Sequence, residues 1–181
     1  MSCTLTLGRK EPCKDSIGGL KAVYFTDFGD YGTVTETDDE ITDLTGTFTA
    51  FKYELKGNSS FEQAITSSRE NGTTFFDQTL TLTLKKLSKE DNKELKLLAY
   101  GRPHVAVEDY NGNVFVMGLQ HGAEVTGGTV STGAAMADLS GYTLTLNAQE
   151  VKPANFVNAP TAANPFSTVA SGSSVTEGTN S

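Results

Sequence analysis

The chain has no tryptophan, two histidines and two cysteines, Cys3 and Cys13, among its 181 residues. Two thiols are too few for the disulfide framework of a small secreted domain, so we interpret them as free thiols in a reducing compartment. Neither His104 nor His121 has Cys or Asp neighbours at metal-ligand spacing, which argues against a metal site. A core must therefore be built without metal or disulfides, from aliphatic residues, ten Phe and six Tyr.

Long apolar runs are also missing. No segment approaches the ~20 apolar residues of a membrane span. The first residues, MSCTLTLGRK, lack the apolar centre of a signal peptide. We therefore expect a soluble protein with no membrane partner, made and kept inside a cell.

Positive charge is scarce. The chain has 14 Lys and Arg against 22 Asp and Glu, a formal net charge of −8, and no lysine between Lys96 and Lys152. Because affinity for nucleic acid comes largely from basic residues, this composition argues against a surface that grips phosphates. It remains compatible with a protein that nucleic acid passes without sticking.

Signatures of enzymes and ligand loops are incomplete. Gly122 and Gly127 have the spacing of a phosphate-binding loop, but Gly128 and Thr129 follow where Lys and Ser or Thr are needed. The residues from Asp109 begin like a calcium loop, yet its glycine falls at the fourth position instead of the sixth. We find no nucleophile motif and no βαβ unit, and we expect neither catalysis nor a cofactor.

Threonine alternating with apolar residues is the abundant pattern. The tetrapeptide TLTL occurs at 4–7, 79–82 and 143–146. An alternation of period two predicts strands with one face on a core and the other exposed. We predict strands near 20–27, 45–56, 60–69, 74–86, 103–109, 113–119, 122–130 and 141–151.

Turns and one helix complete the predicted framework. Asn71-Gly72 and Asn111-Gly112 each separate two strand patterns and predict hairpins with type I′ turns. Ser88, followed by acidic residues, predicts the start of a helix at about 88–100, which Gly101 ends. The fold class is thus mainly β: an antiparallel β-sandwich or small barrel flanked by one α-helix, with an extended loop and a C-terminal arm.

Two segments are polar enough to lie outside a core. The segment ETDDEITD at 36–43 is interpreted as a solvated loop or strand end, and its acidic residues are Glu36, Asp38, Asp39, Glu40 and Asp43. Residues 1–157 are assigned to the β domain, and residues 158–181 to a small, polar, flexible arm. We leave open whether the arm is mobile or folds onto a neighbouring subunit, with Phe166 as its anchor.

The glycine-rich stretch HGAEVTGGTVSTGAAMADLSGYTLTL, residues 121–146, needs an architectural explanation once phosphate binding is set aside. We interpret the small residues at 126–138 as a flexible connection between two strands. Its glycines are expected to permit bends and close packing of backbones.

The order of these elements resembles the tail tube proteins (major tail proteins) of phages. The resemblance covers roughly residues 20–157 and is carried by SRENGTTFFDQTLTLTLKKL, by NGNVFVMGLQHGAEV, and by TGAAMADLSGYTLTLNAQE followed by KPANFV. It implies a β-sandwich or small barrel with one flanking helix, six copies of which form a ring. Strands of each copy join a continuous barrel around a lumen, rings stack into a tube, and DNA passes through without specific binding.

The function expected from this resemblance is that of a structural virion protein, assembled in the host cytoplasm, whose partners are itself and other tail proteins. The acidic residues of 36–43 are candidates for the lumen or a ring contact. Two alternatives remain open. One is another virion component, such as a neck or connector ring or a capsid decoration protein. The other is a soluble β-domain that binds a ligand.

Overall fold

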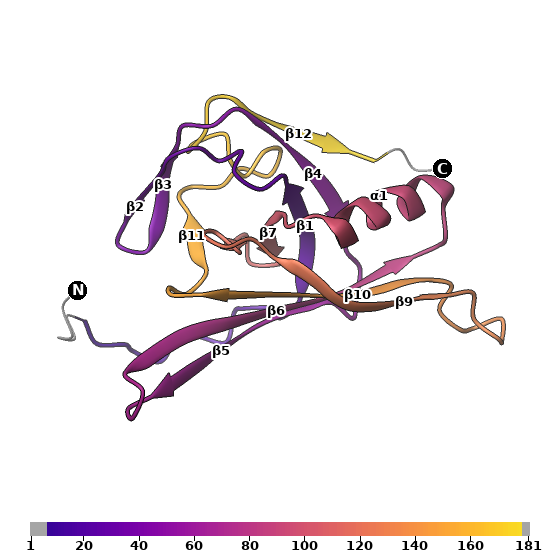
Figure 1. Cartoon of the computed structure of the whole chain (residues 1–181), viewed down its shortest axis with the longest axis horizontal. Coiled ribbons are helices and arrows are strands. Elements are labelled where there is room, and N and C mark those ends of the chain that lie inside the picture. The colour runs from indigo at the N-terminus through magenta and orange to yellow at the C-terminus, as the bar shows by residue number, and fades with distance from the viewer. Residues whose placement is uncertain (1–6, 179–181) are drawn as a thin grey trace.

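The computed structural model describes residues 7–178, so Cys3 and most of the first TLTL lie outside the described residues (Figure 1). The strands are β1 (Leu20–Thr26), β2 (Val34–Thr37), β3 (Glu40–Leu44), β4 (Phe48–Glu54), β5 (Ser60–Ser68), β6 (Thr73–Lys85), β7 (His104–Asp109), β8 (Val114–Met117), β9 (Glu124–Ser131), β10 (Gly141–Glu150), β11 (Asn155–Val157) and β12 (Ser173–Glu177). The helix is α1 (Lys89–Tyr100).

The strands form two sheets. Eight of them lie in the order β12-β4-β1-β7-β8-β11-β3-β2, and four in the order β5-β6-β10-β9. The larger sheet arches over the upper half of the molecule, the smaller one lies beneath it, and α1 flanks one end (Figure 1). The predicted mainly β fold with one flanking helix is therefore confirmed. No helix among the described residues has the length and hydrophobicity to cross a membrane.

The larger sheet is buried on both faces at its centre. Alternate residues of β1 point to opposite sides, so Ala22 and Tyr24 enter one core cluster while Val23 and Phe25 enter another. The second cluster lies between the two sheets and includes Leu80, Leu82 and Leu146 of the smaller sheet. The first cluster lies on the other face, inside the arch.

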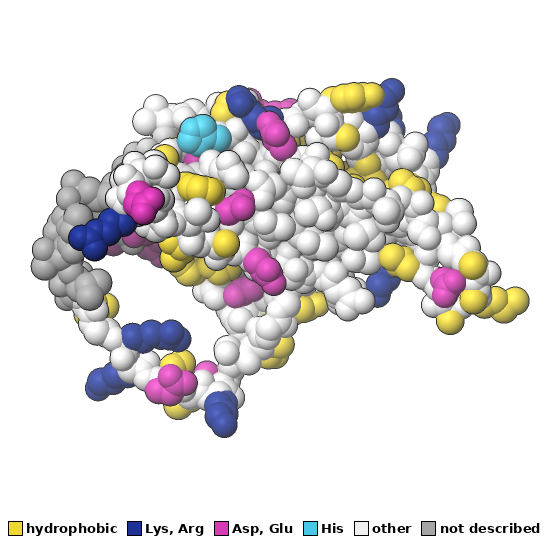
Figure 2. Space-filling model, turned by 60° about the horizontal axis from the view of Figure 1, so that its bottom comes forward, with side chains coloured by type: hydrophobic (Ala, Val, Ile, Leu, Met, Phe, Trp, Pro, Cys, Tyr) yellow, Lys and Arg dark blue, Asp and Glu magenta, His cyan; other side chains and the backbone are white. Residues whose placement is uncertain are grey.

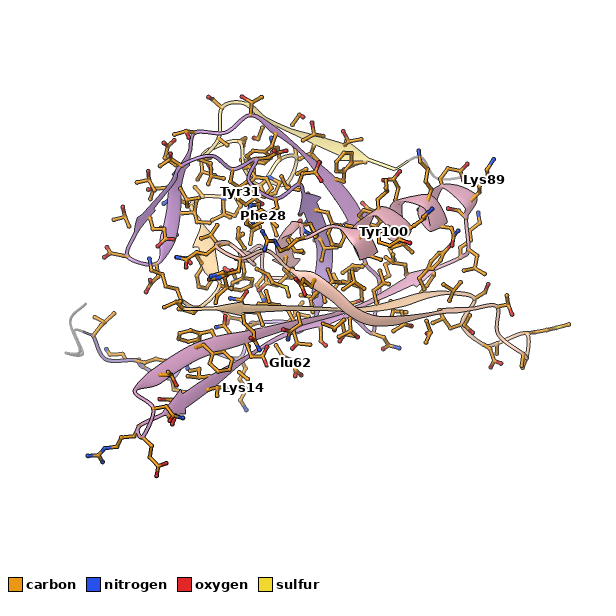
Figure 3. All side chains as sticks on the ribbon, in the orientation of Figure 1. Lys14, Phe28, Tyr31, Glu62, Lys89 and Tyr100 are labelled. Atoms are coloured by element: carbon orange, nitrogen blue, oxygen red, sulfur yellow. The ribbon has the colours of Figure 1, made fainter. Side chains whose placement is uncertain are left out.

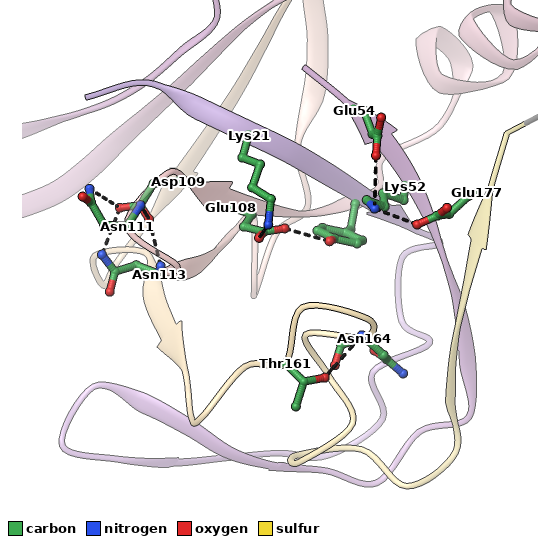
Figure 4. Close-up of polar contacts among 11 residues, drawn as sticks. Lys21, Lys52, Glu54, Glu108, Asp109, Asn111, Asn113, Thr161, Asn164 and Glu177 are labelled. Atoms are coloured by element: carbon green, nitrogen blue, oxygen red, sulfur yellow. Dashed lines mark hydrogen bonds and ion pairs between the residues drawn. The ribbon is translucent and has the colours of Figure 1, made fainter. Parts of the chain in front are cut away.

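The C-terminal segment fills that arch, which corrects its interpretation as a flexible arm separate from a domain that ends at residue 157. Phe166 is fully buried, and its ring centroid lies 6.4 Å from that of Tyr24 and 5.2 Å from that of Phe48. After it, β12 pairs in parallel with β4, and Lys52 forms an ion pair of 2.6 Å with Glu177 (Figure 4). The segment looked too polar to order itself, but three apolar residues suffice because they complete an existing core.

Helix α1 begins as predicted. The Oγ of Ser88 accepts a hydrogen bond of 3.0 Å from the backbone N–H of Asp91, and two acidic residues lie in the first turn. The face of α1 that packs against the sheets is narrow, because Leu95 is buried and Leu98 is half-buried while Ala99 is exposed. The hydroxyl of Tyr142 donates to the carbonyl of Ser88 at 3.0 Å and fixes the start of α1 against β10.

Both predicted hairpins exist, but the prediction that they have type I′ turns is wrong. Gly72 and Gly112 have positive φ, of 65° and 84°, whereas Asn71 and Asn111 do not. A type I′ turn needs positive φ at both central residues, and these longer loops need it only at the glycine. In the second loop the carboxylate of Asp109 accepts from the backbone N–H groups of Asn111 and Asn113, at 2.9 and 2.8 Å (Figure 4).

His104 fixes the loop after β1 to the loop after β8. Its ring stacks against Phe28 and Tyr31, at centroid distances of 4.9 and 4.4 Å. Figure 3 labels these two aromatic residues near each other. The Nε2 atom accepts from the N–H of Gly29 at 3.1 Å, so Nδ1 is the protonated nitrogen that donates to the carbonyl of Gly118 at 2.8 Å. The contact at Nε2 requires neutral histidine, because a protonated Nε2 cannot accept. Burial lowers the pKa of His104.

Removing the Phe166 side chain should destabilise the whole protein, not only its C-terminus. We expect Phe166→Ala to lower the free energy of unfolding by ~3–5 kcal/mol, because it opens a cavity in a shared core. The control is Phe51→Ala, whose side chain is 45% exposed on neighbouring β4 and should cost about 1 kcal/mol or less. Urea unfolding of both variants measures this, and equal losses would contradict the assignment of Phe166 to the core.

The stability of the protein should fall as the pH drops below about 6.5, the usual pKa of histidine. The folded state lowers the pKa of His104, so the unfolded chain binds its proton more readily. The contribution is complete above the unfolded pKa and is lost as pH falls through the folded pKa. Urea unfolding between pH 7.5 and 5 should show this decline, reduced in His104→Phe and retained in a His121→Gln control. An unchanged decline in His104→Phe would refute the assignment.

Candidate functional site: an outward sheet face with two free edges

The lower face of the four-stranded sheet is mostly polar and faces solvent, although most of its central side chains are half-buried among their neighbours. In β6 and β10 the leucines point into the core, and the intervening positions point outward. The outward side chains on the two central strands are polar apart from Phe75: Thr73, Asp77, Thr79, Thr81, Thr83, Lys85, Thr143, Thr145, Asn147 and Gln149. Figure 2 looks toward this side, and its centre is largely free of hydrophobic and basic side chains.

Hydrogen bonds between strands order this face. Asn147 donates from Nδ2 to the carboxylate of Asp77 at 2.6 Å and to the hydroxyl of Thr79 at 3.3 Å. Threonines lie directly opposite one another, as in the pairs Thr81–Thr145 and Thr83–Thr143. Cross-strand pairs of this kind stabilise a flat, regular surface.

The charge on this face is negative. Glu62 of β5 lies opposite Thr79, and Glu124 of β9 lies opposite Asn147, so both share the outward side with Asp77. Glu62 projects below the sheet in Figure 3. All outward positions of the four strands lie within the described residues. The basic residue among them is Lys85, at the end of β6. Such a face repels phosphate.

The two edges of this sheet are open, unlike those of the larger sheet. The larger sheet ends in β2, of four residues with a bulge between Thr35 and Glu36, and in β12, of five residues. The smaller sheet ends in β5, of nine residues, and in β9, of eight, each with a single charged residue. Short, bulged edges discourage pairing with another chain, whereas long, weakly charged edges invite it.

The strands of the smaller sheet are staggered. Strand β5 pairs with residues 73–81 of β6, whereas β9 pairs with residues 141–147 of β10, which lie opposite residues 79–85 of β6. The sheet therefore shifts along its strands in one direction from β5 to β9. A stagger of this kind is what strands tilted around a barrel require.

An open groove of about 540 Å³ runs between α1 and β9. Its wall on the helix is formed by Asn92, Leu95 and Lys96, its floor by residues 125–130 of β9, and its inner end by Tyr142 and Leu144. Val130 is 64% exposed there although its position faces the core side of the sheet. The groove is thus mainly apolar, with polar residues such as Asn92 and Lys96 on the helix side, and it lies along one free edge.

Two glycines of the sequence 121–146 lie where strands approach closely. A Cβ atom on Gly141 would meet the carbonyl oxygen of Leu84 at 2.0 Å, and one on Gly128 would meet that of Thr143 at 2.6 Å. The prediction of close backbone packing fits both. The connection between the two strands is shorter than the predicted 126–138, because β9 continues to Ser131. The loop that follows is held by the carboxylate of Asp138, which accepts hydrogen bonds from the N–H groups of Ala134 and Ala135.

The acidic candidates of 36–43 do not converge on a ligand. They form the β2–β3 hairpin, in which Glu36 pairs with Lys152 at 2.5 Å and Glu40 accepts from Asn158 at 3.0 Å. Asp38 and Asp39 form the two-residue turn, with φ of 54° and 62°, and Asp43 is exposed on β3. No cluster of three or more His, Cys, Asp or Glu residues suited to a metal ion occurs in residues 7–178.

The four turn residues have separate structural roles. Asn71 and Gly72 close the tip of the β5–β6 hairpin, at the far end of the polar face. Asn111 instead holds the N-terminal segment: its amide accepts from the backbone N–H of Ile17 at 2.9 Å and donates to the same residue's carbonyl at 2.8 Å. Gly112 supplies the positive φ of that loop.

Sequence reasoning missed the groove and the open edges. Alternation assigns Val130 and Ile65 to the inward side of their strands, but it cannot show that neighbouring elements end before covering them. No family model matches the chain, and no curated protein and no solved structure does either.

Substitutions in the turn at Asp38 and Asp39 should increase the stability of the protein. Positive φ disfavours residues with a Cβ atom, and Asn-Gly suits a type I′ turn better. We expect the double substitution Asp38→Asn and Asp39→Gly to raise the free energy of unfolding by about 0.5–1 kcal/mol. Thermal unfolding measures it. Asp43→Asn removes a charge from the same hairpin outside the turn, and an equal gain there would attribute the effect to charge instead.

Proposed function

We propose that the protein is a structural virion subunit that assembles into rings of six copies, which stack into a phage tail tube for genome delivery. The supporting observation is the four-stranded sheet, which combines a polar, acidic outward face with two long, open and staggered edges. The resemblance of the element order to tail tube proteins supplies the number of copies.

The geometry of the sheet suits a conduit. Joining β9 of one copy to β5 of the next would continue the sheet around a ring, with the polar face inside. Six sheets of four strands give a barrel wider than one of 16 to 18 strands, which already encloses an aqueous channel. A lumen lined by threonine and carboxylates offers DNA no cationic contacts, so DNA passes without being held.

Electron microscopy of the purified full chain tests the assembly. We expect rings and tubes with a lumen of about 2 nm or more, scaled from the dimensions of the duplex. Protein that stays strictly monomeric at high concentration would overturn the proposal. Rings that never stack would favour a neck or connector component.

The lumen can be tested by charge. Thr81 and Thr145 lie opposite each other on the outward face, so tubes carrying Thr81→Lys and Thr145→Lys should retain short DNA in a salt-dependent way. Lysines placed at Ser171 and Thr176, which are exposed on the other side of the molecule, provide the control. Equal retention by both double variants would place the lumen elsewhere.

A further inference from the structure

The groove between α1 and β9 has no occupant within the described chain, and its floor is a free sheet edge. We propose that it receives Ile65 of a neighbouring copy, so that the β5–β6 hairpin of one subunit locks against β9 and α1 of the next. This inference rests on the proposed function and specifies the contact between subunits.

Ile65 is an inward residue without a core to enter. Its partner across the hairpin is Phe76, and the same side of β6 carries Leu80 and Leu82 further along, both fully buried. Ile65 itself is 68% exposed, because the hairpin extends past the larger sheet at the lower left of Figure 1. It is therefore an aliphatic side chain on the core side of an open edge strand.

The pairing direction follows from the sheet. Strands β5, β6, β10 and β9 are successively antiparallel, so β5 runs opposite to β9. A rotation about an axis that relates copies in a ring preserves strand direction relative to that axis. Strand β5 of the next copy therefore meets β9 in the antiparallel sense, as at every other junction of this sheet.

The register follows from the stagger. From β5, centred on residue 77 of β6, to β9, centred opposite residue 82, the sheet shifts by about five residues over three steps. A fourth step, to the next copy's β5, brings the total shift to about six residues, an even number that keeps each face on its own side. Ile65, level with Phe76 in its own sheet, then comes level with Leu82 and Leu144, opposite Gly128 on β9.

The seat suits this side chain. Gly128 has no side chain to occupy the groove, Leu144 and Leu95 form its apolar walls, and exposed Val130 lies two residues along the same face. Burying an aliphatic side chain and covering Val130 at once removes apolar surface from water on both copies. The groove of about 540 Å³ leaves room for it without rearrangement.

Charge supports the same register. The shift brings Arg69, at the hairpin tip, beside Glu124 at the start of β9, and both are exposed in the single copy. On the outward face it places Ala64 opposite Thr129, so the polar surface continues across the junction. One register thus aligns an apolar contact inside, an ion pair at the end and a polar face outside.

Cysteine crosslinking tests the register. In a background carrying Cys3→Ser and Cys13→Ser, the double variant Ala64→Cys and Thr129→Cys should form disulfides between copies, seen as a ladder on non-reducing gels. Both residues are exposed and small. Pairing Ala64→Cys with Ser131→Cys, two residues away, should crosslink far less. Equal crosslinking of both pairs, or none in the first, overturns the register.

The lock itself is tested by Ile65→Asp against Ile65→Val. Neither should alter thermal unfolding of the isolated subunit, because Ile65 is exposed there. We expect Ile65→Asp to raise the concentration needed for rings by on the order of tenfold or more, and Ile65→Val to leave it near wild type. Rings of Ile65→Asp at the wild-type concentration would refute the lock while leaving the proposed function intact.

Absence of rings in the wild type would instead defeat both proposals.

A hydrophobic dye tests the other possible occupant of the groove, a small apolar ligand. Dye bound in the groove should be displaced when wild-type rings assemble. Dye retained in fully assembled rings shows that the groove is a ligand pocket and contradicts the inference.

Discussion

The structure depends on the pairing of β1 with β7, two strands that are buried on both faces. A strand buried on both sides needs a layer of protein above it and another below it. The four-stranded sheet provides one layer, and the C-terminal segment around Phe166 provides the other. The cost of burying polar groups here is met by a network, since Glu108 accepts from Lys21 at 2.5 Å and from the hydroxyl of Tyr24 at 2.8 Å (Figure 4).

The need to cover both faces of β1 and β7 gives the two sheets different roles. The larger sheet has both faces covered at its centre and both edges short, so it has little left to offer a partner. The smaller sheet covers the larger one with its leucine side and leaves its threonine side and both edges to solvent. Burial of that outward side is not needed for folding, because the alternation of Leu and Thr in 79–84 and 143–146 satisfies the core with one face alone. The unused surface is therefore available for assembly.

Much of the fold could be predicted from local patterns. Alternation located the strands of the smaller sheet, and capping chemistry at Ser88 located the helix, because both signals act within a few residues. Turn types were mispredicted because both Asn-Gly loops are longer than two residues and need positive φ only at the glycine. The two-residue turn with positive φ at both positions is made by Asp38 and Asp39 instead. The C-terminal segment could not be predicted, since its few apolar residues gain a core only from strands far earlier in the chain.

The glycines of β9 connect these observations. A side chain at position 128 would occupy the floor of the groove, and its Cβ atom would strike the carbonyl oxygen of Thr143. Glycine at this position permits the close approach to β10 and keeps the floor of the groove bare. It also weakens the strand, because glycine loses the most conformational freedom on ordering and contributes no side chain to packing. A partner strand laid along β9 would supply both the packing and the order that these residues lack, so the feature that makes the edge weak in one copy makes it receptive to another.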